Sequence, residues 1–181
     1  MKKFLVLFSL ISIIPLACAG DSVAGCDDGV VPLNMKVTGL VRHVDDYGRT
    51  VFDVDLKGSP GKATGRGVAI TGFPLMHGDL PAGNACLDLV DVESGMIITE
   101  AQMVLTFADG SMIWGNSPPE GYVCFVPGFA FAPYDIMGGS GRFEGATGWV
   151  AFELDTHGFA PPLPRLVTPE TGIATGEIVL P

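Results

Sequence analysis

Apolar and polar residues alternate along much of the chain, and glycine or proline interrupts the alternation about every ten residues. Alternation with a period of two is typical of strands that bury one face and expose the other. No stretch after the first twenty residues keeps the period of an amphipathic helix for long. The pattern predicts strands over residues 34–44, 50–57, 68–73, 85–92, 96–107, 112–116, 122–126, 132–137, 148–155 and 172–180.

The segments between these strands carry turn residues. Asp109-Gly110 supplies the positive φ that a tight hairpin needs, and the glycine-dense stretch 138–145 is predicted to be a turn. Residues 58–67, rich in glycine, serine and proline, are predicted to be a loop. Many short antiparallel strands in one domain favour a closed barrel or a sandwich, because either arrangement protects exposed strand edges. We expect an all-β fold, a small antiparallel eight-stranded barrel of the calycin-like kind.

Residues 1–19 have the layout of a signal peptide. Two lysines precede the apolar stretch 4–16, which is too short to span a bilayer comfortably. Small residues surround a processing site after Ala19. We therefore expect cleavage there, a single domain over residues 20–181 without a transmembrane segment, and a location that is secreted, in the secretory-pathway lumen or periplasmic.

The cysteines leave several arrangements open. Cys26, Cys86 and Cys124 survive cleavage, and an oxidising export route favours one disulfide and one free thiol. Cys86 and Cys124 lie in strand-like segments and are the preferred pair, while buried thiols that pack as apolar side chains are the alternative. Small residues also precede Cys18 and Cys26, so lipidation of one of these thiols is a rival interpretation of the N-terminal region.

The charge of the chain excludes one class of partner. The formal net charge is −10, and removal of the two N-terminal lysines leaves eight basic against twenty acidic residues, a net charge of −12. Such a chain repels nucleic acid and anionic membranes. His43, His77 and His157 lack the short spacing of metal ligands, and no phosphate-binding loop is present. We expect no nucleic-acid partner, no metal and no cofactor.

One segment, residues 134–150, resembles a known family. Its Gly138-Gly139-Ser140-Gly141, followed by Phe143, Gly145-Ala146 and Gly148, is similar to the signature hairpin of the allene oxide cyclase and dirigent barrel superfamily. The resemblance extends upstream and covers about residues 103 to 154. It implies a barrel in which Phe143 plugs one end, and a small-molecule cyclisation or stereocontrol activity. The motif itself marks the fold and contains no catalytic group.

Three polar residues are our candidates for chemistry inside such a barrel. Glu100 is the one carboxylate in the middle of a long apolar strand, and Tyr134 and Asn116 are hydrogen-bond donors for a reacting oxygen. A carboxyl group in a dry cavity has a raised pKa and is able to act as a general acid or base. The alternative is that Glu100 and its neighbour Gln102 face water on the polar side of an amphipathic strand.

Two functions are compatible with these residues. The first is a barrel that binds an apolar small molecule and steers its cyclisation or isomerisation, since orienting a reactive substrate in a dry cavity supplies much of the rate enhancement. The second is a secreted barrel without chemistry, which binds a lipid-like ligand as lipocalins do or associates into a homo-oligomer. Candidate pocket residues for the first are Phe52, Met103, Phe107, Trp114, Phe125, Phe129 and Phe152.

Overall fold

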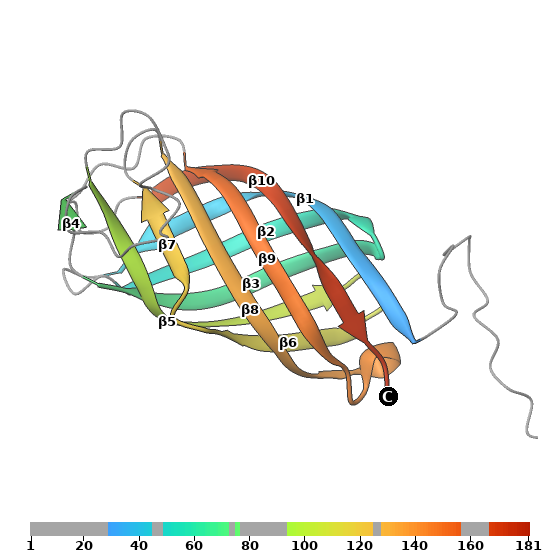
Figure 1. Cartoon of the computed structure of the whole chain (residues 1–181). Coiled ribbons are helices and arrows are strands. Elements are labelled where there is room, and N and C mark those ends of the chain that lie inside the picture. The colour runs from blue at the N-terminus through green and yellow to red at the C-terminus, as the bar shows by residue number, and fades with distance from the viewer. Residues whose placement is uncertain (1–28, 45–48, 73–74, 77–93, 125–127, 157–166) are drawn as a thin grey trace, which may run out of the picture.

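The structure is a computed structural model that describes residues 29–44, 49–72, 75–76, 94–124, 128–156 and 167–181. Eight antiparallel strands lie side by side in a curved sheet that closes into a barrel (Figure 1). They are β1 (Val30–His43), β2 (Arg49–Ser59), β3 (Gly61–Thr71), β5 (Ser94–Phe107), β6 (Met112–Ser117), β8 (Phe129–Ser140), β9 (Thr147–Thr156) and β10 (Val167–Val179).

The strand order around the barrel is β3-β2-β1-β10-β9-β8-β6-β5, and pairing of β3 with β5 closes the ring. Two short strands complete the sheet. β7 (Gly121–Cys124) pairs with β5 and β8 beyond the end of β6, and β4 (Leu75–Met76) pairs with β5. The predicted all-β, eight-stranded antiparallel barrel is therefore confirmed.

The alternation of side chains explains why these strands close around a core. Most inward positions on the strands are apolar, and most outward positions are polar, so closure of the sheet buries the apolar face. The core is contiguous from one end of the barrel to the other. Its members include Leu33, Met35, Val37, Val54, Leu56, Met103, Leu105, Ile113, Ile136, Val150, Phe152, Ala174 and Ile178.

The predicted loop over residues 58–67 is wrong. These residues continue β2 and begin β3, which form a tight hairpin that pairs Lys57 with Lys62. Two glycines of β3, Gly65 and Gly67, make room for packed side chains rather than for a turn. A Cβ atom at Gly65 would lie 2.9 Å from a methyl of Leu105, and the inward position of Gly67 is filled by the ring of Phe52.

A bulge in β5 changes which residues face the interior. Ile70 pairs with Glu100, whereas the next residue of β3 pairs with Ile98, so Thr99 is an extra residue in β5. The bulge shifts the alternation by one position. As a result Ile98 is buried on the inner face with Met103, whereas unbroken alternation along the strand would have placed Ile97 there.

The glycine-rich motif closes one end of the barrel, as predicted. β8 runs into a single 3-10 turn, Gly141–Phe143, which leads back to the adjacent strand β9. Phe143 is 1% exposed, and its ring centroid lies 4.7 Å from that of Phe107. The guanidinium of Arg142 covers both rings, at 4.6 Å from the Phe143 centroid. This end of the barrel is therefore closed by apolar rings, which the Arg142 guanidinium covers on the outside.

Hydrogen bonds tie this turn to the neighbouring β5–β6 hairpin. The backbone N–H of Arg142 donates to Ser111 Oγ at 3.1 Å, and Arg142 Nε lies 3.2 Å from Asp109 Oδ2. The Ser111 N–H donates to the Asp109 carboxylate, and this bond together with the charge of Arg142 lowers the pKa of Asp109 below its usual value. These contacts fix the two hairpins against each other.

Some predictions fall on residues outside the described ranges. The signal peptide 1–19, the strand 85–92 and the cysteines Cys26 and Cys86 are among them. Cys124 is fully buried and disulfide-bonded, while its pairing with Cys86 stays a prediction. Within the described part of the chain, no helix has the length and apolar character needed to cross a membrane.

Candidate functional site

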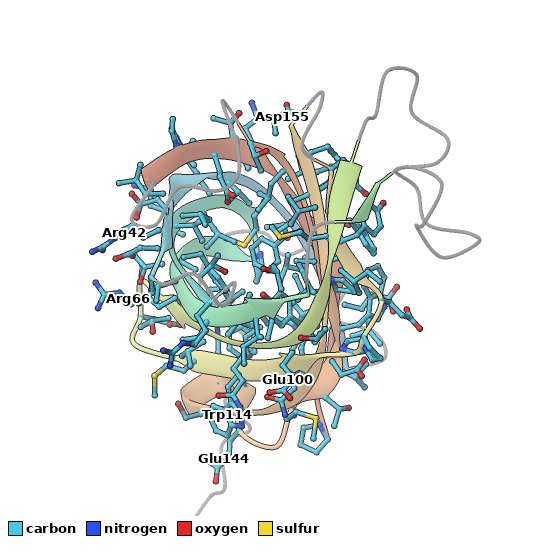
Figure 2. All side chains as sticks on the ribbon, turned by 90° about the vertical axis from the view of Figure 1, so that its left-hand side faces the viewer. Arg42, Arg66, Glu100, Trp114, Glu144 and Asp155 are labelled. Carbon is cyan, nitrogen blue, oxygen red and sulfur yellow. The ribbon has the colours of Figure 1, made fainter. Side chains whose placement is uncertain are left out.

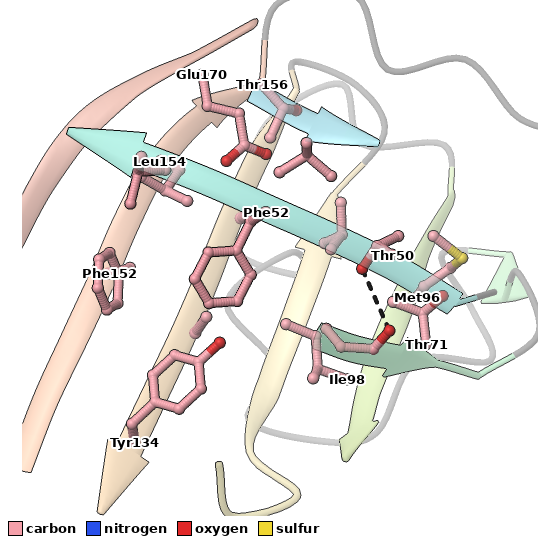
Figure 3. Close-up of a pocket in the computed structure, with 16 residues that line it drawn as sticks. Thr50, Phe52, Thr71, Met96, Ile98, Tyr134, Phe152, Leu154, Thr156 and Glu170 are labelled. Carbon is pink, nitrogen blue, oxygen red and sulfur yellow. Dashed lines mark hydrogen bonds between the residues drawn. The ribbon is translucent and has the colours of Figure 1, made fainter. Parts of the chain in front are cut away.

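A cavity lies inside the barrel at the end opposite the Phe143 plug. Its volume is about 70 Å³, enough for several water molecules or a small apolar group. Residues from seven of the eight barrel strands and from β7 line it, and most of them are apolar (Figure 3). The polar residues of the lining are Thr50, Thr71, Tyr134, Thr156 and Glu170.

Glu170 is the one carboxylate in this lining. It is the fourth residue of β10 and follows the alternation of that strand, in which Gly172, Ala174, Gly176 and Ile178 also point inward. Only 5% of its surface is exposed. Because burial in apolar surroundings disfavours the charged form, the pKa of Glu170 rises from 4.5 to about 8. At neutral pH the side chain is a neutral carboxylic acid.

Among the described residues, none gives the Glu170 carboxyl group a hydrogen-bond partner. Glu170 pairs across the sheet with Thr156 on one side and with Gly39 on the other, and Gly39 has no side chain to offer. Glu170 Oε2 and Thr156 Oγ1 are both buried and lack a partner among the described residues. Unsatisfied buried polar atoms are costly, and in native proteins they are rare enough to indicate a function.

Tyr134 enters the same cavity from β8. Its ring packs edge-on against Phe152 at 5.7 Å and lies 6.3 Å from Phe52. Burial, and secondly the nearby Glu170 carboxyl, raise the pKa of Tyr134 above its usual value, so the phenol stays protonated. Its hydroxyl donates no hydrogen bond within the described residues, and Figure 3 shows it and the Glu170 carboxyl pointing towards the region of the Phe52 ring.

Each of these two groups can polarise a carbonyl or ether oxygen by donating a hydrogen bond to it. A neutral carboxylic acid and a phenol are both proton donors, and each becomes a stronger donor when water is excluded. The apolar wall from Phe52 and Phe152 holds the rest of such a ligand by burial and ring contact. The cavity therefore combines an acid, a second donor and an apolar surface.

The structure places one of the three predicted site residues inside the barrel and the other two on its outer surface. Tyr134 faces the interior as expected. Glu100 and Asn116 are exposed on the outer wall of β5 and β6, and Figure 2 shows Glu100 outside the ring of strands. The prediction that these two point into the barrel is therefore wrong, because the inward positions of β5 beyond the bulge are Ala101, Met103, Leu105 and Phe107. The alternative that Glu100 faces water is correct.

Exposure of Glu100 leads to a simple expectation. Replacement of Glu100 by Gln removes one solvated charge and no buried contact, so the free energy of unfolding should change by less than about 0.5 kcal/mol. Urea unfolding of the variant beside the parent protein measures this. A loss of several kcal/mol would contradict the outward placement.

The predicted pocket residues divide in the same way. Phe52 and Phe152 line the cavity, whereas Met103 and Phe107 belong to the core outside it. Trp114 is 40% exposed on the outer wall, so its assignment to the pocket is wrong. Phe129 is half-buried and does not line the cavity, and Phe125 lies outside the described residues.

Glu170 was missed by the sequence analysis, although one signal was available. From Glu170 to Ile178 every second residue is glycine, alanine or isoleucine except the first, while the intervening positions are Thr171, Ile173, Thr175 and Glu177. Extending that alternation back through Pro169 would have placed Glu170 on the inner face. The predicted last strand begins at Gly172 and therefore leaves Glu170 out.

The described residues contain no group of three or more His, Cys, Asp or Glu side chains with metal-site spacing. The residues around the cavity are one carboxyl, one phenol and threonine hydroxyls, which suit hydrogen bonding to a neutral ligand.

No protein-family model and no curated protein matches this chain. Three solved chains are structurally similar. One is the pterocarpan synthase dirigent protein GePTS1, with 11% sequence identity, a TM-score of 0.42, and coverage of 90% of this chain and 96% of the other. The barrel described above follows from the strand pairing itself.

Proposed function

We propose that this barrel binds an apolar small molecule at its inner cavity and steers an intramolecular cyclisation or isomerisation, with Glu170 as the acid. The observation that carries this proposal is the neutral carboxyl group of Glu170, which lines a mostly apolar cavity and has no hydrogen-bond partner among the described residues. A buried acid that no protein group satisfies destabilises the fold, so a use for it outside folding is the simplest explanation.

The chemistry requires one proton and no cofactor. The Glu170 carboxyl donates its proton to an oxygen of the ligand while the Tyr134 hydroxyl hydrogen-bonds the same oxygen. Positive charge then develops on the neighbouring carbon, a new carbon–carbon bond closes the ring, and the carboxylate takes back the proton that the ligand loses. The apolar wall holds the ligand in one folded conformation, which determines the stereochemistry of the product.

Citronellal is a suitable probe, since acid closes this apolar aldehyde to isopulegol with no change in atomic composition. We expect the protein to accelerate the closure and to enrich one stereoisomer relative to acid in solution. Glu170→Gln keeps the shape of the side chain and removes the proton, so the rate should fall by about two to four orders of magnitude. The parent rate should decrease as pH rises through about 8, where Glu170 ionises.

Glu177→Gln is the matched control, because Glu177 lies on the same strand but is exposed on the outer face. This variant should cyclise the probe as the parent does. A rate that is equal in the Glu170→Gln variant and the parent, or a product ratio identical to that in solution, would contradict the proposal.

A second candidate function is a non-catalytic barrel that carries a ligand or associates with copies of itself. The small size of the cavity favours it, since ligand pockets usually enclose several hundred Å³ and here three aromatic rings occupy much of the space. Recovery of unchanged probe from a stable complex with the protein would support this function over the first.

We also propose that the protein is exported and that residues 1–19 are removed. The disulfide at Cys124 supports this route, because such bonds persist in oxidising compartments. Intact-mass analysis of protein recovered after export should give a chain that begins at Gly20. A mass increased by a diacylglyceryl group, on a chain beginning at Cys18 or Cys26, would support lipidation instead.

A further inference from the structure

The cations of this acidic protein are concentrated on one outer wall. Among the described residues, all lysines and arginines except Arg142 lie on β1, β2 and β3, where their side chains are exposed. The same wall carries only two acids, Asp53 and Asp55, whereas β8, β9 and β10 contain no lysine or arginine in their described residues. The cations are Lys36, Arg42, Arg49, Lys57, Lys62 and Arg66. The wall is positive on a chain whose net charge is −10.

Three of these cations form a row across the strands. Lys36 pairs directly with Lys57, and Lys57 pairs directly with Lys62. Like charges at directly opposed positions are destabilising, and none of the three lysines forms an ion pair within the described residues. A surface groove of about 600 Å³ runs beside the row, where Thr38 and Thr64 add hydroxyl groups and Asp55 adds one carboxylate against the three lysines. An anion in this groove would relieve the repulsion.

A second groove, of about 680 Å³, lies further along the same wall. Arg42 and Arg66 border it, and Figure 2 shows both pointing outward on one side of the barrel. Arg66 contacts Asp53 at 3.4 Å, yet 78% of its side chain remains exposed. Gln102 and Asn116 pair directly across β5 and β6, and their amides have no hydrogen bond to any described residue. This groove therefore presents guanidinium and amide groups side by side.

Trp114 completes the second groove with an exposed aromatic face. Its indole lies against Gly138 of β8, where a Cβ atom would be 2.7 Å from Cζ2. The missing side chain at Gly138 lets the ring rest on the neighbouring strand, which restricts its orientation. Tryptophan side chains are usually well buried. The indole of Trp114 is fixed in orientation and yet 40% exposed, which is typical of tryptophans at binding surfaces.

We propose that this wall of the barrel binds an anionic glycan, a sugar chain that carries carboxylate or sulfate groups. Guanidinium and ammonium groups pair with such anions, and amide side chains both donate to and accept from hydroxyls. The indole face packs against the apolar C–H face of a sugar ring. Lys57 and Val51 are six residues apart on β2, roughly 20 Å, so a ligand that reaches both grooves is an extended chain.

The two tryptophans of the chain make this proposal testable by fluorescence. Trp114 lies in the groove, and Trp149 is similarly exposed but lies on β9, in the wall without cations. In the Trp149→Phe variant the only indole is Trp114, and in Trp114→Phe it is Trp149. Titration with oligogalacturonides and with heparin fragments should change the emission of Trp149→Phe saturably and leave that of Trp114→Phe unchanged.

Affinities of variants test the charge contribution. Calorimetric titration should show binding about tenfold weaker for Trp114→Ala. It should be about three- to tenfold weaker for Lys57→Gln, which should also reduce the salt dependence of binding. Glu153→Gln, an exposed change on β9, should bind like the parent. Unchanged melting temperatures confirm that the variants are folded.

Several results would overturn the proposal. An equal response to neutral cello-oligosaccharides would show that the charges of the ligand do not contribute to binding. Full affinity in the Lys57→Gln variant would show the same for the lysine row. Binding of single-stranded DNA or of anionic phospholipid vesicles as tight as that of the glycans would show a general polyanion surface. An emission change from Trp149 and none from Trp114 would locate the ligand elsewhere.

Discussion

Replacement of Glu170 by Gln is expected to remove a steep pH dependence from the stability of the protein. The pKa of Glu170 is about 8 in the folded protein and close to 4.5 when the chain unfolds. Between these values the folded protein holds a proton that the unfolded chain has released. The free energy of unfolding therefore falls as pH rises, by up to about 1.4 kcal/mol for each pH unit.

The sign of this effect identifies its source. Below about pH 4.5 the carboxyl is neutral in both states, so parent and Glu170→Gln should be of similar stability. Above about pH 8 the parent must bury a charge, and the variant should be more stable by on the order of 5 kcal/mol. Salt-bridged carboxylates give the opposite trend, since their stabilisation is lost at low pH.

Urea unfolding from pH 4 to pH 9, followed by circular dichroism, measures the difference between the two proteins. Contributions of the other titratable groups cancel in that difference. Glu177→Gln, on the outer face of the same strand, should follow the parent curve. A constant difference across the pH range would mean that Glu170 is not buried as the structure has it.

Truncation of Phe143 to Ala is the second change with a large expected effect. The ring is 1% exposed, contacts Phe107, and lies under the Arg142 guanidinium. Its removal leaves a cavity in the plug that the surrounding strands cannot close, because hydrogen bonds fix the adjoining hairpins. We expect the free energy of unfolding to fall by about 3 to 5 kcal/mol.

The same change should leave the chemistry of the barrel largely intact, since the plug and the Glu170 cavity lie at opposite ends. Thermal and urea unfolding give the stability, and the citronellal assay below the melting temperature gives the activity. Met137→Ala is the control, because Met137 is 61% exposed and its truncation should cost less than about 0.5 kcal/mol. Equal melting temperatures for Phe143→Ala and Met137→Ala would show that Phe143 is no plug.

The sequence by itself determined most of the strands, an antiparallel fold that is either a barrel or a sandwich, and the glycine-rich turn that carries Phe143. Alternation in segments such as 148–155 is a local property, because it can be seen in one strand without knowing which strands pair with it. The glycines at positions 138, 139 and 141 are also a local signal, because glycine allows the positive φ that a tight turn needs. The inward position of Tyr134 follows from its strand in the same way, since Ala132 and Ile136 share its face.

Only the tertiary structure decided which face of an ambiguous strand is inside. Thr99 is an extra residue in β5, and the need to pair with β3, β6 and β7 determines where that bulge falls. Residues 58–67 became strand because neighbouring side chains from β2 and β5 fill the space that their glycines leave, which no local propensity records.

The candidate site depends on the same distinction. Glu170 faces the cavity because β10 begins at Val167 and is held from both sides by β1 and β9, although a proline precedes this glutamate. The pairing with β1 joins residues more than a hundred positions apart, so the chain near Glu170 does not reveal it. Burial by partners from distant strands also raises the pKa of Glu170, which is why the acid could be found only in the folded barrel.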